Sequence, residues 1–216
     1  LDLSKSSDKQ VAEKEDARAS FLIPIAKAFS TDIGCRVADL GIQVHGGMGY
    51  VEETGAAQVL RDVRVTAIYE GTNGIQAIDL IGRKLSDSGK AANGLIDEIK
   101  ITIRNCGDHE DLQIKEMGNR LSKSLVCMES SLNWMLKRED FNDRLAGATP
   151  FLKAFGLLLG ANYLVKAALN TGALDRKSLA QFYCLYILPE MEAYGFMSQS
   201  GQHSLYSFSD NFFGFS

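Results

Sequence analysis

The sequence has little proline, few histidines and no long apolar run. Only 3 of its 216 residues are proline, which excludes a proline-rich linker protein and favours long helices. Because it contains no run of 18 apolar residues, the sequence predicts no membrane-spanning helix. It opens on Leu1 without a basic segment followed by an apolar one, so no signal peptide is predicted. Since Leu1 is not methionine, we expect a processed chain or a piece of a longer one.

The four cysteines do not predict a metal site. They lie at positions 35, 106, 127 and 184, too far apart for a CxxC pair, and no histidine spacing completes a zinc site. Cys35, Cys127 and Cys184 fall in stretches with helical apolar spacing. We therefore expect them to be small buried residues in a reducing compartment, and we predict a cytoplasmic location.

The charge balance argues against a nucleic-acid partner. The chain has 23 basic and 27 acidic residues, a formal net charge of −4. Residues 1–87 hold 10 basic and 13 acidic side chains, and residues 88–216 hold 13 and 14. Because nucleic-acid-binding domains depend on a basic surface, neither part fits that class.

Apolar residues take up helical spacing from about residue 17. The spacing from Leu22 to Val44 predicts one long helix ended by Gly46-Gly47. Residues 1–15 are polar and are expected to form a frayed lead-in. A short helix is predicted after Thr54 as N-cap, while residues 63–68 alternate loosely and resemble a strand. A further helix is expected from Thr72 or Asn73, with an apolar face at Ile75, Ile78, Ile81 and Leu85.

The remainder of the chain predicts a second group of helices. Residues 86–94 are rich in Ser, Gly and Asn and are the predicted linker. Apolar spacing then indicates helices near 95–103, 114–135 and 148–170, and a fourth from about 176 that Pro189 bends or ends. Short loops between them favour an antiparallel bundle. We predict an all-α fold with one domain over 1–87 and a second over 88–216.

The end of the chain is unusually aromatic. The last 35 residues hold 10 of the 19 aromatic residues, with Phe208, Phe212, Phe213 and Phe215 closest to the end. A free tail of this composition would be an exposed apolar patch. We expect it to cover a surface of its own bundle, of a neighbouring subunit or of another domain.

Two glycine-rich turns carry the possible chemistry. Residues 43–49 (QVHGGMG) could let a backbone approach a ligand closely. This turn closes a helix, however, whereas a phosphate prefers the opening of one, so a tight helix-to-helix turn is the competing interpretation. His45, His109 and His203 share no motif and suggest no catalytic triad.

The second turn, residues 69–74 (YEGTNG), holds a carboxylate just before a predicted helix. Glu70 is either an ordinary acidic residue favoured by the helix dipole or a general base. In the second case an apolar, ligand-closed pocket would raise its pKa towards neutrality. The residues by themselves leave both interpretations open.

Together these segments resemble a known family. Residues 43–50 (QVHGGMGY), Arg61-Asp62 and residues 68–73 (IYEGTN) are similar, in order and spacing, to the C-terminal helical domain of acyl-CoA dehydrogenases. The resemblance covers about residues 17–85. It is strongest to the 3-methylmercaptopropionyl-CoA dehydrogenase branch, which carries an additional helical domain. Residues 88–216 correspond to that acetyl-CoA-dehydrogenase-C-terminal-like domain by position and helical character.

The resemblance implies FAD-dependent α,β-dehydrogenation of an acyl-CoA thioester, with Glu70 as the base that removes the α-proton. Tyr69, Glu70 and Gly71 would line the substrate site. The remaining positions would meet FAD: Thr72, Asn73 and Gly74 near its phosphates, and Gln43, Val44, His45, Gly46 and Gly47 at the ADP half of a partner subunit's FAD. Many family members have glutamine where this chain has Gly74, so only a backbone contact remains there.

The same resemblance implies partners and a larger protein. It implies a homodimer or dimer of dimers and an electron-transferring flavoprotein as acceptor. The family's N-terminal and middle domains are absent here, so we expect a C-terminal fragment that is inactive alone. The alternatives are a non-catalytic helical assembly module and a DNA-associated flavoprotein relative, the latter disfavoured by the acidic charge balance.

Overall fold

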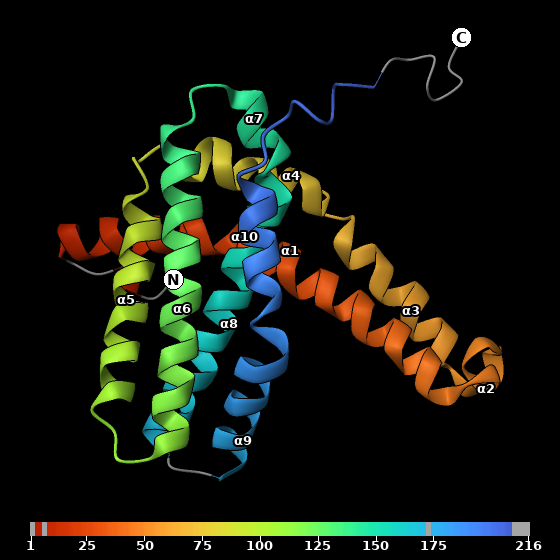
Figure 1. Cartoon of the computed structure of the whole chain (residues 1–216). Helices are drawn as coiled ribbons and strands as arrows, with labels where there is room; N and C mark the ends of the chain where they lie inside the picture. Colours follow the sequence, from red (N-terminus) through yellow and green to blue (C-terminus); the bar gives the residue numbers. More distant parts are fainter. Residues whose placement is uncertain (1–2, 6–7, 172–173, 209–216) are drawn as a thin grey trace.

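The fold is all-α, as predicted. The computed structural model describes residues 3–5, 8–171 and 174–208, and every regular element in these ranges is a helix or a helical turn (Figure 1). The strand considered for residues 63–68 is wrong. Val63 and Arg64 end one helix, and Val65–Ala67 form a single 3₁₀ turn.

The first part of the chain consists of one long helix and several short elements. In chain order they are η1 (Leu3–Lys5), α1 (Lys9–His45), α2 (Gly47–Tyr50), η2 (Glu52–Thr54), α3 (Ala56–Arg64), η3 (Val65–Ala67), α4 (Asn73–Asp79) and the π-turn η4 (Leu80–Lys84). Helix α1 crosses behind the upright helices and extends away from them, and α2 and α3 lie at its far end (Figure 1).

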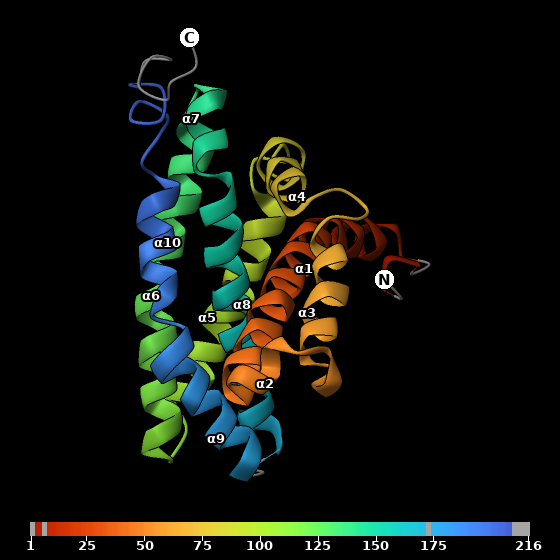
Figure 2. The same ribbon diagram turned by 90° about the vertical axis from the view of Figure 1, so that its right-hand side faces the viewer.

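The second part forms the upright bundle. Its elements are α5 (Lys90–Gly107), α6 (Leu112–Lys137), α7 (Phe141–Ala146), α8 (Ala148–Thr171), α9 (Leu174–Phe182), the π-turn η5 (Tyr183–Ile187) and α10 (Glu190–Ser198). Figure 2 shows α8 enclosed between α1 on one side and α6 and α10 on the other. The predicted fourth helix is broken because η5 interrupts it and Pro189 is the N-cap of α10.

Helix α1 begins earlier than expected. The Asp8 carboxylate accepts hydrogen bonds from the N–H groups of Gln10 and Val11, which satisfies two donors that a helix start leaves free. Residues 9–15 are therefore helical rather than frayed. The helix ends at His45 as predicted, where Gly46 takes a positive φ of 60°. The predicted N-cap of the short helix after Thr54 is wrong by one residue, because Gly55 is the N-cap of α3.

The apolar face of α1 is buried along only half of its length. Phe21 and Ile25 lie in the core, whereas Val37, Leu40 and Val44 are 60%, 53% and 85% exposed. The periodic spacing predicts that these residues share one face, but the described helices α2 and α3 leave this face exposed in the second half of α1. The next predicted apolar face is divided in the same way, since Ile75 and Ile78 in α4 are exposed, whereas Ile81 in η4 and Leu85 at its end are buried.

The two parts of the chain share one hydrophobic core. The rings of Phe21 in α1 and Phe155 in α8 meet edge to face, with centroids 5.2 Å apart. The predicted linker is partly helical, because Lys90 opens α5 and Ala92 is fully buried. The Asp87 carboxylate accepts from the N–H of Lys90 and so fixes this helix start. A division into domains at 87/88 remains a prediction.

Helix α8 is the central helix of the bundle. Among the described residues it is the one helix long and apolar enough to cross a membrane, and 61% of that apolar window is buried inside the fold. Burial of this kind is what the core helix of a bundle requires. Cys106 and Cys184 are also buried, and burial raises the pKa of their thiols to about 11 and about 12. Cys35 and Cys127 are only half-buried.

The chain beyond α10 is attached to α7 by a carboxylate. Asp143 is buried, and it accepts hydrogen bonds from the Gln202 N–H (2.8 Å) and the Arg138 guanidinium. Tyr206 and Phe208 are 74% and 52% exposed. The other aromatic residues of the predicted tail, at 212, 213 and 215, lie outside the described residues.

We expect Asp143→Asn to weaken the acid dependence of stability. The Gln202 N–H, and next the Arg138 guanidinium, hold the pKa of Asp143 below its usual range. A depressed pKa contributes stability above the unfolded value of about 4, and this contribution is lost as pH falls through the folded value. Urea unfolding at pH 3, 4 and 7 should show a smaller loss on acidification in the variant. Parallel losses would contradict this assignment.

Candidate functional site

The turn formed by residues 69–72 lies between η3 and α4 and packs on the middle of α1. The N–H groups of Ile68 and Tyr69 both donate to the Val65 carbonyl at 3.0 Å. Glu70 then takes φ +54° and Gly71 φ +89°. A left-handed conformation is easy for glycine but costs a residue with a side chain about 1–2 kcal/mol. The surrounding structure therefore holds Glu70 in a backbone conformation that is unfavourable for the residue by itself.

Two side chains hold the carbonyls of this turn. The Gln76 amide donates to the Glu70 carbonyl at 3.0 Å, and the Lys27 ammonium donates to the Gly71 carbonyl at 2.8 Å. The Lys27 nitrogen also lies 5.9 Å from the centre of the Tyr69 ring. The Glu70 side chain is exposed and Tyr69 is 52% exposed. The Glu70 side chain is thus exposed to solvent, while the hydrogen bonds from Gln76 and Lys27 fix the backbone of the turn.

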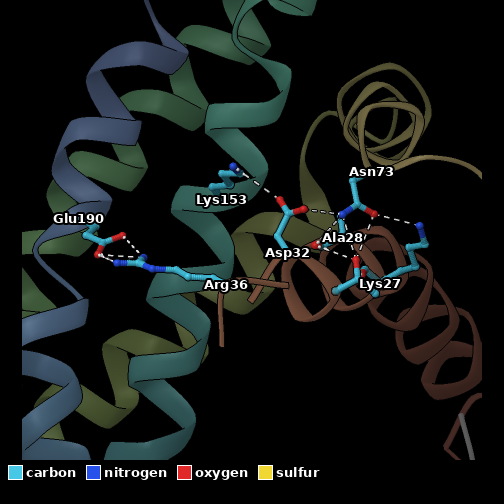
Figure 3. Close-up of polar contacts among 8 residues, drawn as sticks. Lys27, Ala28, Asp32, Arg36, Asn73, Lys153 and Glu190 are labelled. Atoms are coloured by element: carbon cyan, nitrogen blue, oxygen red, sulfur yellow. Dashed lines mark hydrogen bonds and ion pairs between the residues drawn. The ribbon is translucent and has the colours of Figure 1, made fainter. Parts of the chain in front are cut away.

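The Asn73 amide is occupied by contacts within the chain (Figure 3). Its oxygen accepts from Lys27 (2.9 Å) and Thr31 (3.2 Å). Its nitrogen donates to the Ala28 carbonyl (3.2 Å) and the Asp32 carboxylate (2.7 Å). The side chain therefore ties the start of α4 to α1, and only the backbone N–H of Asn73 is left for a ligand.

Asp32 connects this network to the second part of the chain. Its other carboxylate oxygen lies 3.5 Å from the Lys153 nitrogen in α8. One turn further along α1, Arg36 donates to both oxygens of Glu190 in α10 at 3.2 Å. Figure 3 shows the two ion pairs. Their residues, together with Tyr194, line a cavity of about 250 Å³.

The glycine-rich turn at residues 43–49 lies far from the Glu70 turn. Lys27 touches the Glu70 turn, and Gln43 is 16 residues further along the same helix, roughly 24 Å away at 1.5 Å per residue. There Val44 is 85% exposed, and the His45 ring nitrogen Nδ1 lies 2.8 Å from the Gly41 carbonyl oxygen. A single copy of the chain does not bring the two predicted sets of cofactor residues into one pocket.

Several glycines of the two turns leave room for a ligand. A Cβ built on Gly46, Gly47 or Gly74 would meet no atom within 4 Å, and only Gly46 of the three has a positive φ. The packing of this chain therefore does not require glycine at Gly47 or Gly74. An open backbone next to exposed Thr72 fits the close approach of a nucleotide. FAD, the cofactor predicted to contact these turns, contains such a nucleotide.

Sequence reasoning missed Lys27 and Gln76, the two residues that hold the turn. The one signal was a lysine set between the apolar positions Ile25 and Phe29, where the helix faces the core. Its acceptor, 44 residues away, has no counterpart in the local pattern. Throughout residues 3–5, 8–171 and 174–208, no three His, Cys, Asp or Glu side chains gather as metal ligands.

Comparison with known proteins identifies two matching regions. Residues 5–85 match the family described as "Acyl-CoA dehydrogenase, C-terminal domain", and residues 95–209 match "Acetyl-CoA dehydrogenase C-terminal like". 3-Methylmercaptopropionyl-CoA dehydrogenase of Ruegeria pomeroyi is 38% identical over 161 residues, which are 73% of this chain and 27% of that protein.

Two further relatives match less than half of the chain's length. Very long-chain specific acyl-CoA dehydrogenase of Bos taurus is 36% identical over 99 residues, 46% of this chain and 14% of that protein. A butyryl-CoA dehydrogenase of Syntrophomonas wolfei is 39% identical over 88 residues, 40% of this chain and 14% of that protein. The chain thus spans about a quarter or less of the curated relatives it matches.

Proposed function

The chain belongs to the acyl-CoA dehydrogenase family, and we propose that it supplies the general base, Glu70, to an FAD-dependent acyl-CoA dehydrogenase. The observation that carries this proposal is the conformation of Glu70. It is a non-glycine residue with φ +54°, it is exposed, and side chains from two helices hold its turn. Strain of this kind is maintained where a side chain must be aimed.

The proposed reaction is α,β-dehydrogenation of an acyl-CoA thioester. The Glu70 carboxylate takes the α-proton onto one of its oxygens. The Glu70 N–H donates to the thioester oxygen and stabilises the charge that develops there, while Tyr69 and Gly71 line the acyl group. When bound, FAD supplies the acceptor for the hydride that leaves the β-carbon.

The two turns would hold different parts of FAD. Thr72 and the backbone of Asn73 and Gly74 would face its phosphates at the start of α4. Residues 43–47 would contact the ADP half of FAD in a partner subunit. The roughly 24 Å between the turns and the exposed apolar side chains of α1 support a homodimer or a dimer of dimers.

We further propose that the chain is the C-terminal portion of a longer cytoplasmic enzyme. It spans 27% of the 3-methylmercaptopropionyl-CoA dehydrogenase that it matches. The rest of the protein would supply most of the flavin cradle and the CoA groove. An electron-transferring flavoprotein would then reoxidise the flavin.

The test compares the complete enzyme with the 216-residue chain. We expect the complete enzyme to purify yellow and to lose its flavin absorbance when a matching acyl-CoA from a panel is added. The chain alone should be colourless, because tight binding needs contacts along the whole ligand. Absorbance spectra with and without acyl-CoA measure both. A yellow complete enzyme that no acyl-CoA bleaches would instead support a non-catalytic assembly module.

A further inference from the structure

We propose that Lys27 is the positioning residue of the Glu70 turn, with Asn73 and Asp32 fixing the direction of its ammonium group. This inference rests on the proposed role of Glu70 as base. It assigns a task to a lysine that lies outside both glycine-rich turns. The proposal is built from the contacts that join α1 to the turn.

The backbone of the Glu70 turn needs support from outside the turn. Glu70 and Gly71 are consecutive residues with positive φ, so the chain between η3 and α4 has no regular hydrogen-bond ladder to hold it. For Glu70 the left-handed region is unfavourable. Unless the carbonyls on either side are held, the turn would relax to a conformation that aims the carboxylate elsewhere.

Of the hydrogen bonds from Gln76 and Lys27 to the carbonyls of the turn, only the one from Lys27 comes from a different part of the fold. Gln76 lies in α4, six residues from Glu70, so its bond moves together with the turn. Lys27 lies in α1, 44 residues from Gly71. Its neighbours Ile25 and Ala28 are buried in the core. The bond from Lys27 therefore fixes the turn relative to the body of the molecule.

The amide of Asn73 and the carboxylate of Asp32 orient the Lys27 ammonium group. Lys27 donates to Gly71 at 2.8 Å and to the Asn73 oxygen at 2.9 Å, and the Asn73 nitrogen donates to the Asp32 carboxylate at 2.7 Å. The amide thus turns its oxygen to the cation and its N–H to the anion. The reverse orientation would oppose like partial charges on both sides. Asn73 and Asp32 hold Lys27 directed at Gly71.

The experiment measures how often the turn opens, in the 216-residue chain without flavin or substrate. A glutamate-specific endoprotease cleaves the Glu70–Gly71 bond only when that segment leaves its folded turn. Cleavage after Glu139, in the exposed connection between α6 and α7, is the internal standard. We expect Lys27→Met to accelerate cleavage after Glu70 about 10-fold relative to this standard, because two charge-assisted hydrogen bonds are lost.

A control, a conservative variant and a second test variant complete the experiment. Lys84→Met also removes a bond between α4–η4 and α1, the one from Lys84 to the Ser20 hydroxyl, but it does not touch the turn. It should leave the cleavage ratio unchanged. Lys27→Arg keeps the charge and donors and should restore most of the protection. Asn73→Ala keeps Lys27 but removes the amide that directs its ammonium group, together with the bonds of that amide to Ala28 and Asp32. It should accelerate cleavage even if Lys27→Met fails to fold.

The outcomes separate this proposal from the proposed function. An unchanged cleavage ratio in Lys27→Met and Asn73→Ala, or an equal acceleration in Lys84→Met, overturns the positioning role. In the complete enzyme we expect Lys27→Met to lower kcat about 10-fold with KM nearly unchanged, and Lys27→Arg to recover it. A faster cleavage with unaltered kcat also overturns the role. A wild-type enzyme without dehydrogenase activity refutes only the proposed function.

Discussion

Replacing Glu70 by glutamine is expected to lower turnover of the complete enzyme at least about 100-fold, the lower end of what loss of a general base costs. The α-proton of a thioester is weakly acidic, so its removal needs a positioned base. Glutamine keeps the size of the side chain and removes its basicity. Because Gln76 and Lys27 hold the backbone carbonyls of the turn, the exchange should leave the turn intact and binding of FAD and acyl-CoA nearly unchanged.

Stopped-flow flavin bleaching at saturating acyl-CoA measures this step. Glu53→Gln and Asp62→Asn are the matched controls, since both residues are exposed and lie outside the turn. Neutralising either should cost little. If Glu70→Gln bleaches flavin at the wild-type rate, the base lies elsewhere in the enzyme and the site assignment is wrong.

Truncating Phe155 to alanine is expected to destabilise the chain by about 3–5 kcal/mol. Phe155 is fully buried in α8. Its ring meets Phe21 of α1 at 5.2 Å and Phe151 at 5.8 Å between centroids. Removal of the ring leaves a cavity at the point where the two parts of the chain meet, and neither neighbour can close it without leaving its own contacts.

Chemical denaturation followed by circular dichroism gives the free energy of unfolding. Phe196→Ala is the control, because Phe196 is 72% exposed on α10, and it should change stability by less than about 0.5 kcal/mol. We expect one cooperative transition that shifts as a whole in Phe155→Ala. Two transitions, of which only one shifts, would show that residues 1–87 and 88–216 unfold independently.

The helices themselves were largely predictable because helix formation depends on local spacing. The apolar residues from Ile114 to Met135 recur at intervals of three and four, and the structure has α6 there. The failures occurred where the local signal was weak or misleading. The six-residue α7 is too short to show a period, and the π-turn η5 interrupts a stretch that continues the spacing of α9.

Burial was harder to predict than helicity. Val37 and Val44 belong to the same series of apolar residues, three or four positions apart, as Ile25. They lie on the face predicted for the core, yet both are exposed. A period in the sequence identifies which residues share a face, but it does not say what covers that face. The exposed half of α1 became visible only when the positions of the other helices were known.

For this protein the sequence by itself determined the helical class, the family, and the identity of the turn that presents Glu70. These depend on local periodicity and on short motifs whose order and spacing can be read along the chain. Only the tertiary structure decided that Glu70 is left-handed, that Asn73 is occupied internally, and that Lys27 holds the turn. The Lys27–Gly71 bond joins residues 44 positions apart, and the Phe21–Phe155 contact joins residues still more distant. Such contacts depend on how the helices pack, which no local spacing specifies.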